Sequence, residues 1–313
     1  MYHSHLLINV GDNPDRPDWN ITRRWLRNLY RVHQRLCMAF PPCVPATVAE
    51  RIAAYCAPYG GCGAHDRDLP GEGDPGVPPC SAPVHSERSD EAGFLFRIDH
   101  PVCDVVNGRA TRSGHPRRRP VIVVQSGGDQ PPDWGLAFGL SENAVDDRGR
   151  PIGNAAHLLA GPPQYRKVSF TLEGDALRLS REDRPDGGFT VRPGDLVRFR
   201  LRANPCRKVQ DGSPNGKRKR VMPTFDAHAE WLHERLDGAV GSPICIDTFV
   251  PGWAAAWRTK HEPQANQKMQ FWSVLFEGTF RVGDTAALKS RVKSGIGPAK
   301  AFGFGLLSIA PVR

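Results

Sequence analysis

In the first half of the chain, short runs of apolar residues alternate with polar ones between turn residues, a pattern typical of strands. We expect strands over residues 5–10, 93–99, 119–127 and 165–174. Between the first two of them, apolar positions over about 29–40 recur at helical spacing, and Asn28 precedes them as a candidate cap. The stretch "QPPDWGLAFGL" predicts a loop or a short helix before the last of these strands.

The second half repeats the order. The pattern predicts a strand over 195–205, a helix over 224–238, two strands that form a long hairpin, a helix over 283–295 that ends at a glycine, and a final strand. Two β-α-β-β-α-β units indicate an α+β protein with two tandem ferredoxin-like (RRM-like) domains and antiparallel sheets. We expect an N-terminal domain over 1–180 and a C-terminal domain over 190–313, joined near 175–194.

An insertion at about 41–93 interrupts the first unit. It is rich in Gly, Pro and charge and has too few apolar residues to bury much surface, which predicts a loop or disorder. The pair Cys62 and His65 has the spacing of half a zinc site, but no second pair completes it, so free thiols are the preferred interpretation and no metal or cofactor is expected. The other candidate ligands in this insertion are Cys43, Cys56, Cys80 and His85.

The charge balance of 42 Lys and Arg against 33 Asp and Glu gives +9 and fits a polyanionic partner. By itself it does not decide between nucleic acid, an anionic membrane surface and an ordinary basic protein. The start of the chain lacks the pattern of a secretory signal, and no apolar run approaches the roughly 20 residues of a membrane-spanning helix. We expect a cytoplasmic protein with reduced thiols and no membrane partner.

The strongest cationic signal lies over residues 197–220, which contain nine Lys or Arg and one Asp. In its strand portion Arg198, Arg200 and Arg202 alternate with apolar residues, so they share one face. Such a face binds a polyanion or is merely solvated, and the first interpretation is favoured. The remaining basic candidates for RNA binding are Lys217, Arg218, Lys219, Arg220 and, in the later hairpin, Arg258, Lys260 and Lys268.

A glycine-rich loop precedes the final strand. A dinucleotide-binding loop follows a first strand and opens a helix, whereas this loop follows a helix and only eight residues come after its last glycine, which argues against a nucleotide-dependent oxidoreductase. Two interpretations stay open: backbone N–H groups that hold an anion beside a lysine, or a tight helix-to-strand connection that needs positive φ. The residues concerned are Gly295, Gly297, Lys300, Gly303 and Gly305.

Tyr30 and His33 lie three residues apart and therefore neighbour each other on one face of the predicted 29–40 helix. An imidazole and a phenol suit acid–base chemistry at a phosphodiester. The helical wheel also places Leu29, Leu36 and Phe40 near His33, so the imidazole is either a catalytic group or a satisfied residue at the edge of the core.

Several segments, in this order along the chain, resemble the CasE family of CRISPR repeat-processing endoribonucleases, which belong to the subtype I-E Cascade complex. The resemblance covers nearly the whole chain except the insertion. It is most specific in "FRLRANP" taken together with the glycine-rich loop. The segments are "MYHSHLLIN", "LYRVHQRL", "FLFRID", "VIVVQS", "FRLRANP", "AEWLHERL", "VLFEGTFRV" and "GIGPAKAFGFGLLSIAP".

The resemblance implies two tandem ferredoxin-like domains that bind a CRISPR repeat RNA hairpin and cleave at the 3′ base of its stem. It implies metal-independent transesterification, with Tyr30 and His33 as the catalytic pair, His33 being either acid or base, and the product retained with other Cascade subunits. Some relatives carry Lys or Ser one turn after the histidine, where this chain has Cys37 and Met38. Arg35 or Lys300 would then stabilise the phosphorane. A non-catalytic RNA-hairpin-binding module is the alternative.

Overall fold

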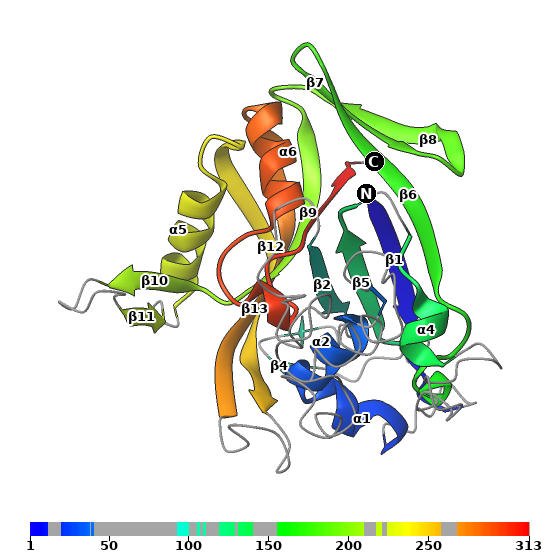
Figure 1. The fold of residues 1–313 in the computed structure, drawn as a ribbon. Coiled ribbons are helices and arrows are strands. Elements are labelled where there is room, and N and C mark those ends of the chain that lie inside the picture. The colour runs from blue at the N-terminus through cyan, green and yellow to red at the C-terminus, as the bar shows by residue number, and fades with distance from the viewer. Residues whose placement is uncertain are drawn as a thin grey trace, which may run out of the picture.

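The structure is a computed structural model. It contains two four-stranded units with the same strand topology. Their elements can be traced from the N-terminus to the C-terminus by colour in Figure 1. Of the insertion, the structure describes only residue 93, so its cysteines fall outside the described residues. Arg258 and Lys260 also fall outside them. The described residues are 1–11, 20–37, 39–40, 93–99, 105–106, 109–110, 119–128, 131–139, 155–209, 217–220, 224–257 and 268–312.

The first sheet has the strand order β2-β5-β1-β6-β7-β8. Its first four members pair antiparallel in the ferredoxin-like order, with the first and third strands of the unit in the centre. The last two extend the sheet beyond that pattern. The strands are β1 (Tyr2–Leu7), β2 (Phe94–Asp99), β5 (Val121–Ser126), β6 (Gln164–Glu173), β7 (Ala176–Arg181) and β8 (Arg184–Val191).

The second sheet repeats the topology with the order β12-β13-β9-β14, again antiparallel throughout. Its two longest strands form one hairpin. The predicted fold class of two tandem ferredoxin-like units is therefore confirmed, whereas the residue limits of the two domains stay a prediction. The strands are β9 (Leu196–Ala203), β12 (Val240–Trp257), β13 (Lys268–Val282) and β14 (Leu307–Pro311).

Helices and short strands complete the architecture. The side chains of Thr224 and Asp284 accept hydrogen bonds from backbone N–H groups at two helix starts. Gly295 ends the last helix with φ 72°, as the sequence predicts. The helices are α1 (Asn20–Leu26), α2 (Leu29–Cys37), α4 (Trp134–Phe138), α5 (Phe225–Leu236) and α6 (Thr285–Ser294), with 3-10 turns η2 (Ala156–Leu158) and η3 (Lys300–Phe302). The short strands are β3 (Val105–Val106), β4 (Arg109–Ala110), β10 (Cys206–Val209) and β11 (Lys217–Arg220).

Three elements differ from the sequence predictions. β1 begins at Tyr2 rather than at residue 5, because the alternation of buried and exposed positions already runs from there. Helix α2 ends at Cys37 rather than at 40, because the backbone N–H groups of Ala39 and Phe40 bond three residues back in a tighter turn. The predicted junction near 175–194 contains the paired strands β7 and β8, which continue the first sheet.

The buried apolar side chains form two cores, one centred on each sheet, and each core also includes residues of the other sheet. Alternate residues of the first sheet, among them Leu6, Phe96 and Val124, are buried against helices α1, α2 and α4. Apolar residues of the second sheet pack with α5 and α6 around the fully buried Trp231. The first core also includes Phe304, which follows η3, so the end of the chain packs against the first unit. Within the described residues, no helix is long and apolar enough to span a membrane.

Candidate RNA-processing site

Helix α2 places Tyr30 and His33 on one face, as their spacing predicts. Its start is fixed by Asn28, whose Oδ1 accepts a hydrogen bond from the Tyr30 backbone N–H at 3.2 Å. The same side chain is bound by the end of β12. The Asn28 amide donates to the Trp257 carbonyl at 2.9 Å, and the Trp257 N–H donates to Oδ1 at 3.0 Å. One asparagine therefore joins the helix start to the long hairpin of the second sheet.

The His33 side chain is only 4% exposed and Tyr30 only 8%. The imidazole stacks on Phe94 of β2, with ring centroids 5.7 Å apart and planes 24° apart, and it also lies beside Phe302 of η3, at 6.1 Å between centroids. The Cys37 sulfur, one turn later, lies 3.4 Å from Nε2. His33 thus sits at the edge of the first core and against the glycine-rich loop at once. Its chemical role stays a prediction.

The loop from Gly295 to Gly305 joins α6 to β14 and contains η3. The four glycines have φ between 72° and 90°, and Ala299 between them has φ 64°. A side chain on Gly303 would place its Cβ 2.9 Å from the Phe96 ring, and one on Gly297 would place it 3.0 Å from Trp231. The glycine pattern therefore fits the tight-connection interpretation. The anion-binding interpretation stays a prediction, and the loop does lie beside His33, through Phe302.

Two basic candidates near α2, Lys300 and Arg35, are each hydrogen-bonded to a backbone carbonyl. The Lys300 ammonium donates to the Ser294 carbonyl at 2.5 Å, at the end of α6. The Arg35 guanidinium donates to the Ala137 carbonyl at 2.9 Å, in α4. Both bonds fix the shape of the site. The predicted roles of these two residues in RNA binding stay predictions.

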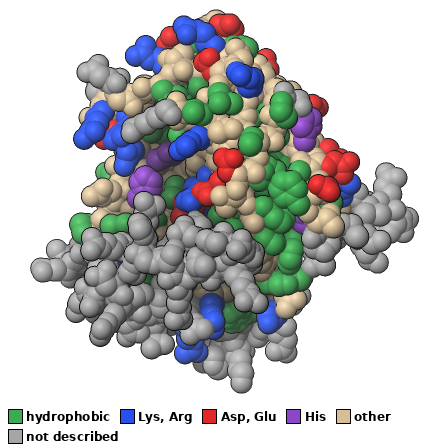
Figure 2. Space-filling view, turned by 180° about the vertical axis from the view of Figure 1, so that it is seen from behind, with side chains coloured by type: hydrophobic (Ala, Val, Ile, Leu, Met, Phe, Trp, Pro, Cys, Tyr) green, Lys and Arg blue, Asp and Glu red, His purple; other side chains and the backbone are tan. Residues whose placement is uncertain are grey.

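The arginines of β9 alternate with buried apolar residues, as predicted: Val197, Phe199 and Leu201 are in the core. Their cationic face, however, meets charged groups of the chain itself. Arg200 forms ion pairs with Asp99 at 3.3 Å and with Glu277. From behind, basic side chains lie close to acidic ones and to histidines near the middle of the molecule (Figure 2).

Arg97 is the residue that joins the two sheets at this cluster. It is 3% exposed, and its guanidinium donates to both oxygens of Asp99, at 2.7 and 3.0 Å. It also donates to the carbonyls of Arg200 and Leu306, at 3.1 and 3.0 Å, and to the Ser308 hydroxyl. A strand of the first sheet is thereby bonded to two strands of the second.

The cluster shifts the pKa of its members. Burial would raise the pKa of the Asp99 carboxyl, but the hydrogen bonds and charges of Arg97, with Arg200 beyond them, hold it below its usual value. Burial lowers the pKa of the Arg202 guanidinium to about 10, and its Nε has no hydrogen-bond partner among the described residues. The Arg202 guanidinium stays protonated at neutral pH. The interface therefore keeps a net positive charge around the two carboxylates of Asp99 and Glu277.

The remaining cationic candidates lie away from this cluster. Strand β11, residues Lys217–Arg220, pairs with β10 beside α5, and the structure describes its backbone only. Lys268 is exposed at the start of β13, opposite Trp257. The structure therefore brings the glycine loop to His33. It places Lys268 opposite Trp257, whose backbone is bonded to Asn28 at the start of α2, and it leaves the β10–β11 strands elsewhere. Within the described part of the chain, no three His, Cys, Asp or Glu side chains form a metal-binding group.

Sequence analysis missed Arg97, Asp99 and Asn28 as links between the two units. A signal for the first two exists: "FLFRID" places a charged pair inside an otherwise apolar strand, and a buried charge needs a partner. Nothing in the sequence identifies that partner, because Arg200 and Glu277 lie 101 and 178 residues beyond Asp99.

The topology and the site define a class of protein: two tandem ferredoxin-like units whose interface brings a helix with a tyrosine and a histidine to a glycine-rich C-terminal loop. Comparison with known proteins narrows that class. Residues 164–311 match the model of a family described as CRISPR associated protein. The resemblance found in the sequence is thereby confirmed for the second half of the chain.

Two curated proteins are similar over 131 residues each. The CRISPR-associated endoribonuclease Cse3 of Thermus thermophilus is 36% identical, over 39% of this chain and 58% of its own length. The CRISPR system Cascade subunit CasE of Escherichia coli is 32% identical, over 40% of this chain and 62% of its own length. The matches thus span about three fifths of the relatives. Among solved structures, CRISPR endoribonuclease Cse3 bound to a 19-nucleotide RNA has a TM-score of 0.50 at 21% identity and covers 99% of this chain, which supports the fold.

Proposed function

We propose that this protein is a CRISPR repeat-specific endoribonuclease. It binds the repeat hairpin, cleaves the precursor RNA at the 3′ base of the stem and stays bound to the product as a Cascade subunit. The observation that carries the proposal is the similarity of about two fifths of the chain to an endoribonuclease Cse3 and to a Cascade subunit CasE. The meeting of α2 with the glycine-rich loop at His33 supplies the candidate centre.

The reaction is a transesterification within the RNA. The 2′-oxygen beside the scissile bond attacks phosphorus while its proton leaves to a base, and the bond to the 5′-oxygen breaks as that oxygen takes a proton. The products are a 2′,3′-cyclic phosphate and a 5′-hydroxyl. A positioned acid or base contributes about 10²–10⁴-fold to the rate. His33 is assigned one of these proton transfers, and Tyr30 orients or deprotonates the 2′-hydroxyl.

Burial of the two rings sets a condition on this mechanism. The scissile phosphate reaches the imidazole only when a neighbour moves, and Phe94 is fixed in the strand that carries the core. Phe302 lies in η3, between two glycines with positive φ, and is only partly buried. We therefore expect RNA binding to displace η3 from His33. Charge on the phosphorane is then stabilised by backbone N–H groups of the loop together with Lys300 or Arg35.

A cleavage assay in EDTA with the repeat hairpin tests the proposal. Wild type should cut at the base of the stem and leave a cyclic phosphate, and His33→Ala should lose about 10²–10⁴-fold in rate while hairpin affinity is kept. Tyr30→Phe tests the phenol without removing the ring. His233→Ala, an exposed histidine of α5, is the matched control and should cut like wild type.

A second candidate function is a non-catalytic module that only binds an RNA hairpin, and the burial of Tyr30 and His33 is the observation that favours it. The same assay decides between the two. Tight binding of intact RNA by wild type supports the module. Cleavage that survives His33→Ala unchanged removes the assigned catalytic centre from the proposal.

A further inference from the structure

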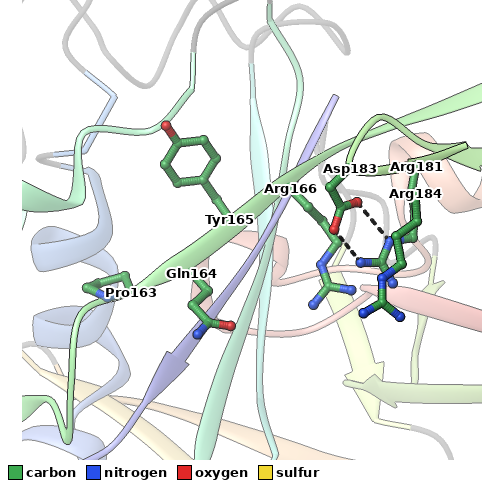
Figure 3. Close-up of a pocket in the computed structure, with 7 residues that line it drawn as sticks. All are labelled: Pro163, Gln164, Tyr165, Arg166, Arg181, Asp183 and Arg184. Carbon is green, nitrogen blue, oxygen red and sulfur yellow. Dashed lines mark hydrogen bonds and ion pairs between the residues drawn. The ribbon is translucent and has the colours of Figure 1, made fainter.

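A groove on the first sheet carries charge that the proposed cleavage centre does not use. It is formed where β6, β7 and β8 lie side by side, and we call it the β6–β8 groove (Figure 3). Arg166, Arg181 and Arg184 extend from the three strands toward one region, with Gln164 beside them, whereas Tyr165 points to the other side of β6. Arg181 pairs with Val168 and with Arg184 in register, so these side chains share one face.

The groove has an excess of positive charge. Asp183 accepts two hydrogen bonds from Arg181, at 3.0 and 2.5 Å, which fixes the orientation of that guanidinium. Arg166 and Arg184 have no carboxylate partner in the part of the chain that the structure describes. Three guanidinium groups therefore face one carboxylate. Such planar groups, two of them unpaired, match the geometry of phosphate oxygens.

Two histidines of β1 border the groove on the same face. In register, His3 lies opposite Arg166 and His5 lies opposite Gln164. Burial lowers the pKa of His3 to about 4, and burial also lowers that of His5; the positive charge of Arg166 lowers both further. The imidazoles are therefore neutral at physiological pH, in a field that already favours an anion. They add polar contacts without competing for the arginines.

The β6–β8 groove is separate from the candidate cleavage centre. Helix α2 covers the opposite face of the sheet, and the glycine-rich loop contacts β2 at one edge, through Leu95 and Phe96. Between β2 and β6 lie β5 and β1, so the groove begins three strand spacings away, about 15 Å at roughly 4.8 Å each. A nucleotide held at His33 is therefore too far away to contact Arg166, so an RNA that reaches both positions does so with two different parts.

We propose that the β6–β8 groove binds the phosphate backbone of single-stranded RNA that flanks the hairpin. The inference rests on the proposed function, because it takes the hairpin to be held at the α2 side. At about 3.4 Å per stacked nucleotide, the gap corresponds to a flank of about four to five nucleotides, or fewer where the strand is extended. The groove therefore adds affinity only for RNA that extends beyond the stem.

The test compares binding of three RNAs that carry a 2′-deoxy nucleotide at the cleavage position and so stay intact: the minimal hairpin, the hairpin with ten flanking nucleotides on the 5′ side, and the same on the 3′ side. The variant is Arg166→Gln with Arg184→Gln. The control is Arg178→Gln with Arg192→Gln, which removes two exposed charges outside the groove. Cleavage is measured separately for all three proteins, on a minimal hairpin that keeps the 2′-hydroxyl at the cleavage position.

Loss of two single-strand phosphate contacts should reduce the salt slope by about 1.4 and the affinity by about 25-fold at 0.1 M salt, from ~0.7 per contact. We expect this loss of affinity with only one of the two flanked RNAs. Affinity for the minimal hairpin should not change, and the control protein should bind all three RNAs like wild type. Equal losses with all three RNAs would mean that the groove binds the stem. Unchanged affinities would mean that it binds another partner, such as an acidic protein segment. Either result overturns the inference. Wild type that fails to cut the minimal hairpin overturns the proposed function instead.

Discussion

The chain contains two Arg–Asp pairs of the same geometry in different surroundings, and they allow a sharp test of what holds the two sheets together. In Arg97–Asp99 and in Arg181–Asp183 the arginine precedes the aspartate by two residues, and its Nε and Nη2 donate to the two carboxylate oxygens. The first pair is buried, with side chains 3% and 15% exposed, whereas the second is open, at 27% and 49%. Only the environment differs.

Asp99→Asn should destabilise the fold by about 3 kcal/mol. Removing one member of a buried pair costs roughly 3–5 kcal/mol because the other charge is left without compensation. The lower end applies here, since the asparagine oxygen keeps one acceptor for Arg97 and since Glu277 still neutralises Arg200. Against a total stability of roughly 5–15 kcal/mol, the loss is easily measured. Asp183→Asn, in a pair screened by water, should leave the unfolding midpoint where it is in wild type.

Urea unfolding followed by tryptophan fluorescence and by circular dichroism measures the difference, because both substitutions remove one charge and almost no volume. If the two variants lose the same stability, burial does not govern the Asp99 pair, and the reasoning fails. The pH dependence gives an independent check. The folded-state pKa of Asp99 lies below its unfolded value of about 3.9, so its contribution is present above that pH and is lost as the pH falls further. Asp99→Asn should therefore flatten the loss of stability below about pH 4.

Three further predictions concern the glycine-rich loop, the helix and the basic strands. Gly303→Ala should destabilise the protein by about 2–4 kcal/mol, since φ is 82° and the new Cβ would lie 2.9 Å from a buried ring; Gly174→Ala, with φ 63° and open space, should cost only about 1–2 kcal/mol in the same thermal melts. Cys37→Ser should move the pH–rate profile of cleavage, because its sulfur contacts the His33 imidazole; an unmoved profile would separate the thiol from catalysis. Neutralising Lys217–Arg220 should weaken RNA binding and flatten its salt dependence, by about 0.7–0.9 in slope per lost contact in a salt titration.

Sequence reasoning succeeded where local chemistry decides structure. The alternation in "VRFRLR" set the buried face of β9, and Asn28 and Gly295 marked helix ends because a cap is a contact between near neighbours. The order of strands and helices then sufficed for both ferredoxin-like units. The β7–β8 pair was missed because glycine, proline and charge in "SREDRPDGG" suggest a linker, although its flanks alternate as strands do.

The candidate site was harder to predict because it depends on contacts between distant segments. Helical spacing put Tyr30 and His33 on one face but did not determine whether that face was open, and the answer came from Phe94 and Phe302, which lie 61 and 269 residues beyond His33. In the same way, the arginines of β9 looked available to a polyanion until Asp99 and Glu277 were found beside Arg200. A charge count along one strand does not include the residues that fold against it.

Asn28 has a consequence for how variants of the long hairpin are interpreted. Its side chain is bonded at the same time to the Tyr30 backbone and to the last residue of β12, with no intervening loop. A force that bends β12 and β13, whether from a bound molecule or from a substitution, is transmitted through that amide, and through the apolar contacts beside it, to the first turn of α2. A variant of the β12–β13 hairpin that cleaves RNA slowly is therefore not automatically a weak RNA binder. It can bind RNA with normal affinity while the Tyr30 phenol and the His33 imidazole are tilted. Affinity and single-turnover rate must be measured on the same preparation before such a residue is counted as a contact.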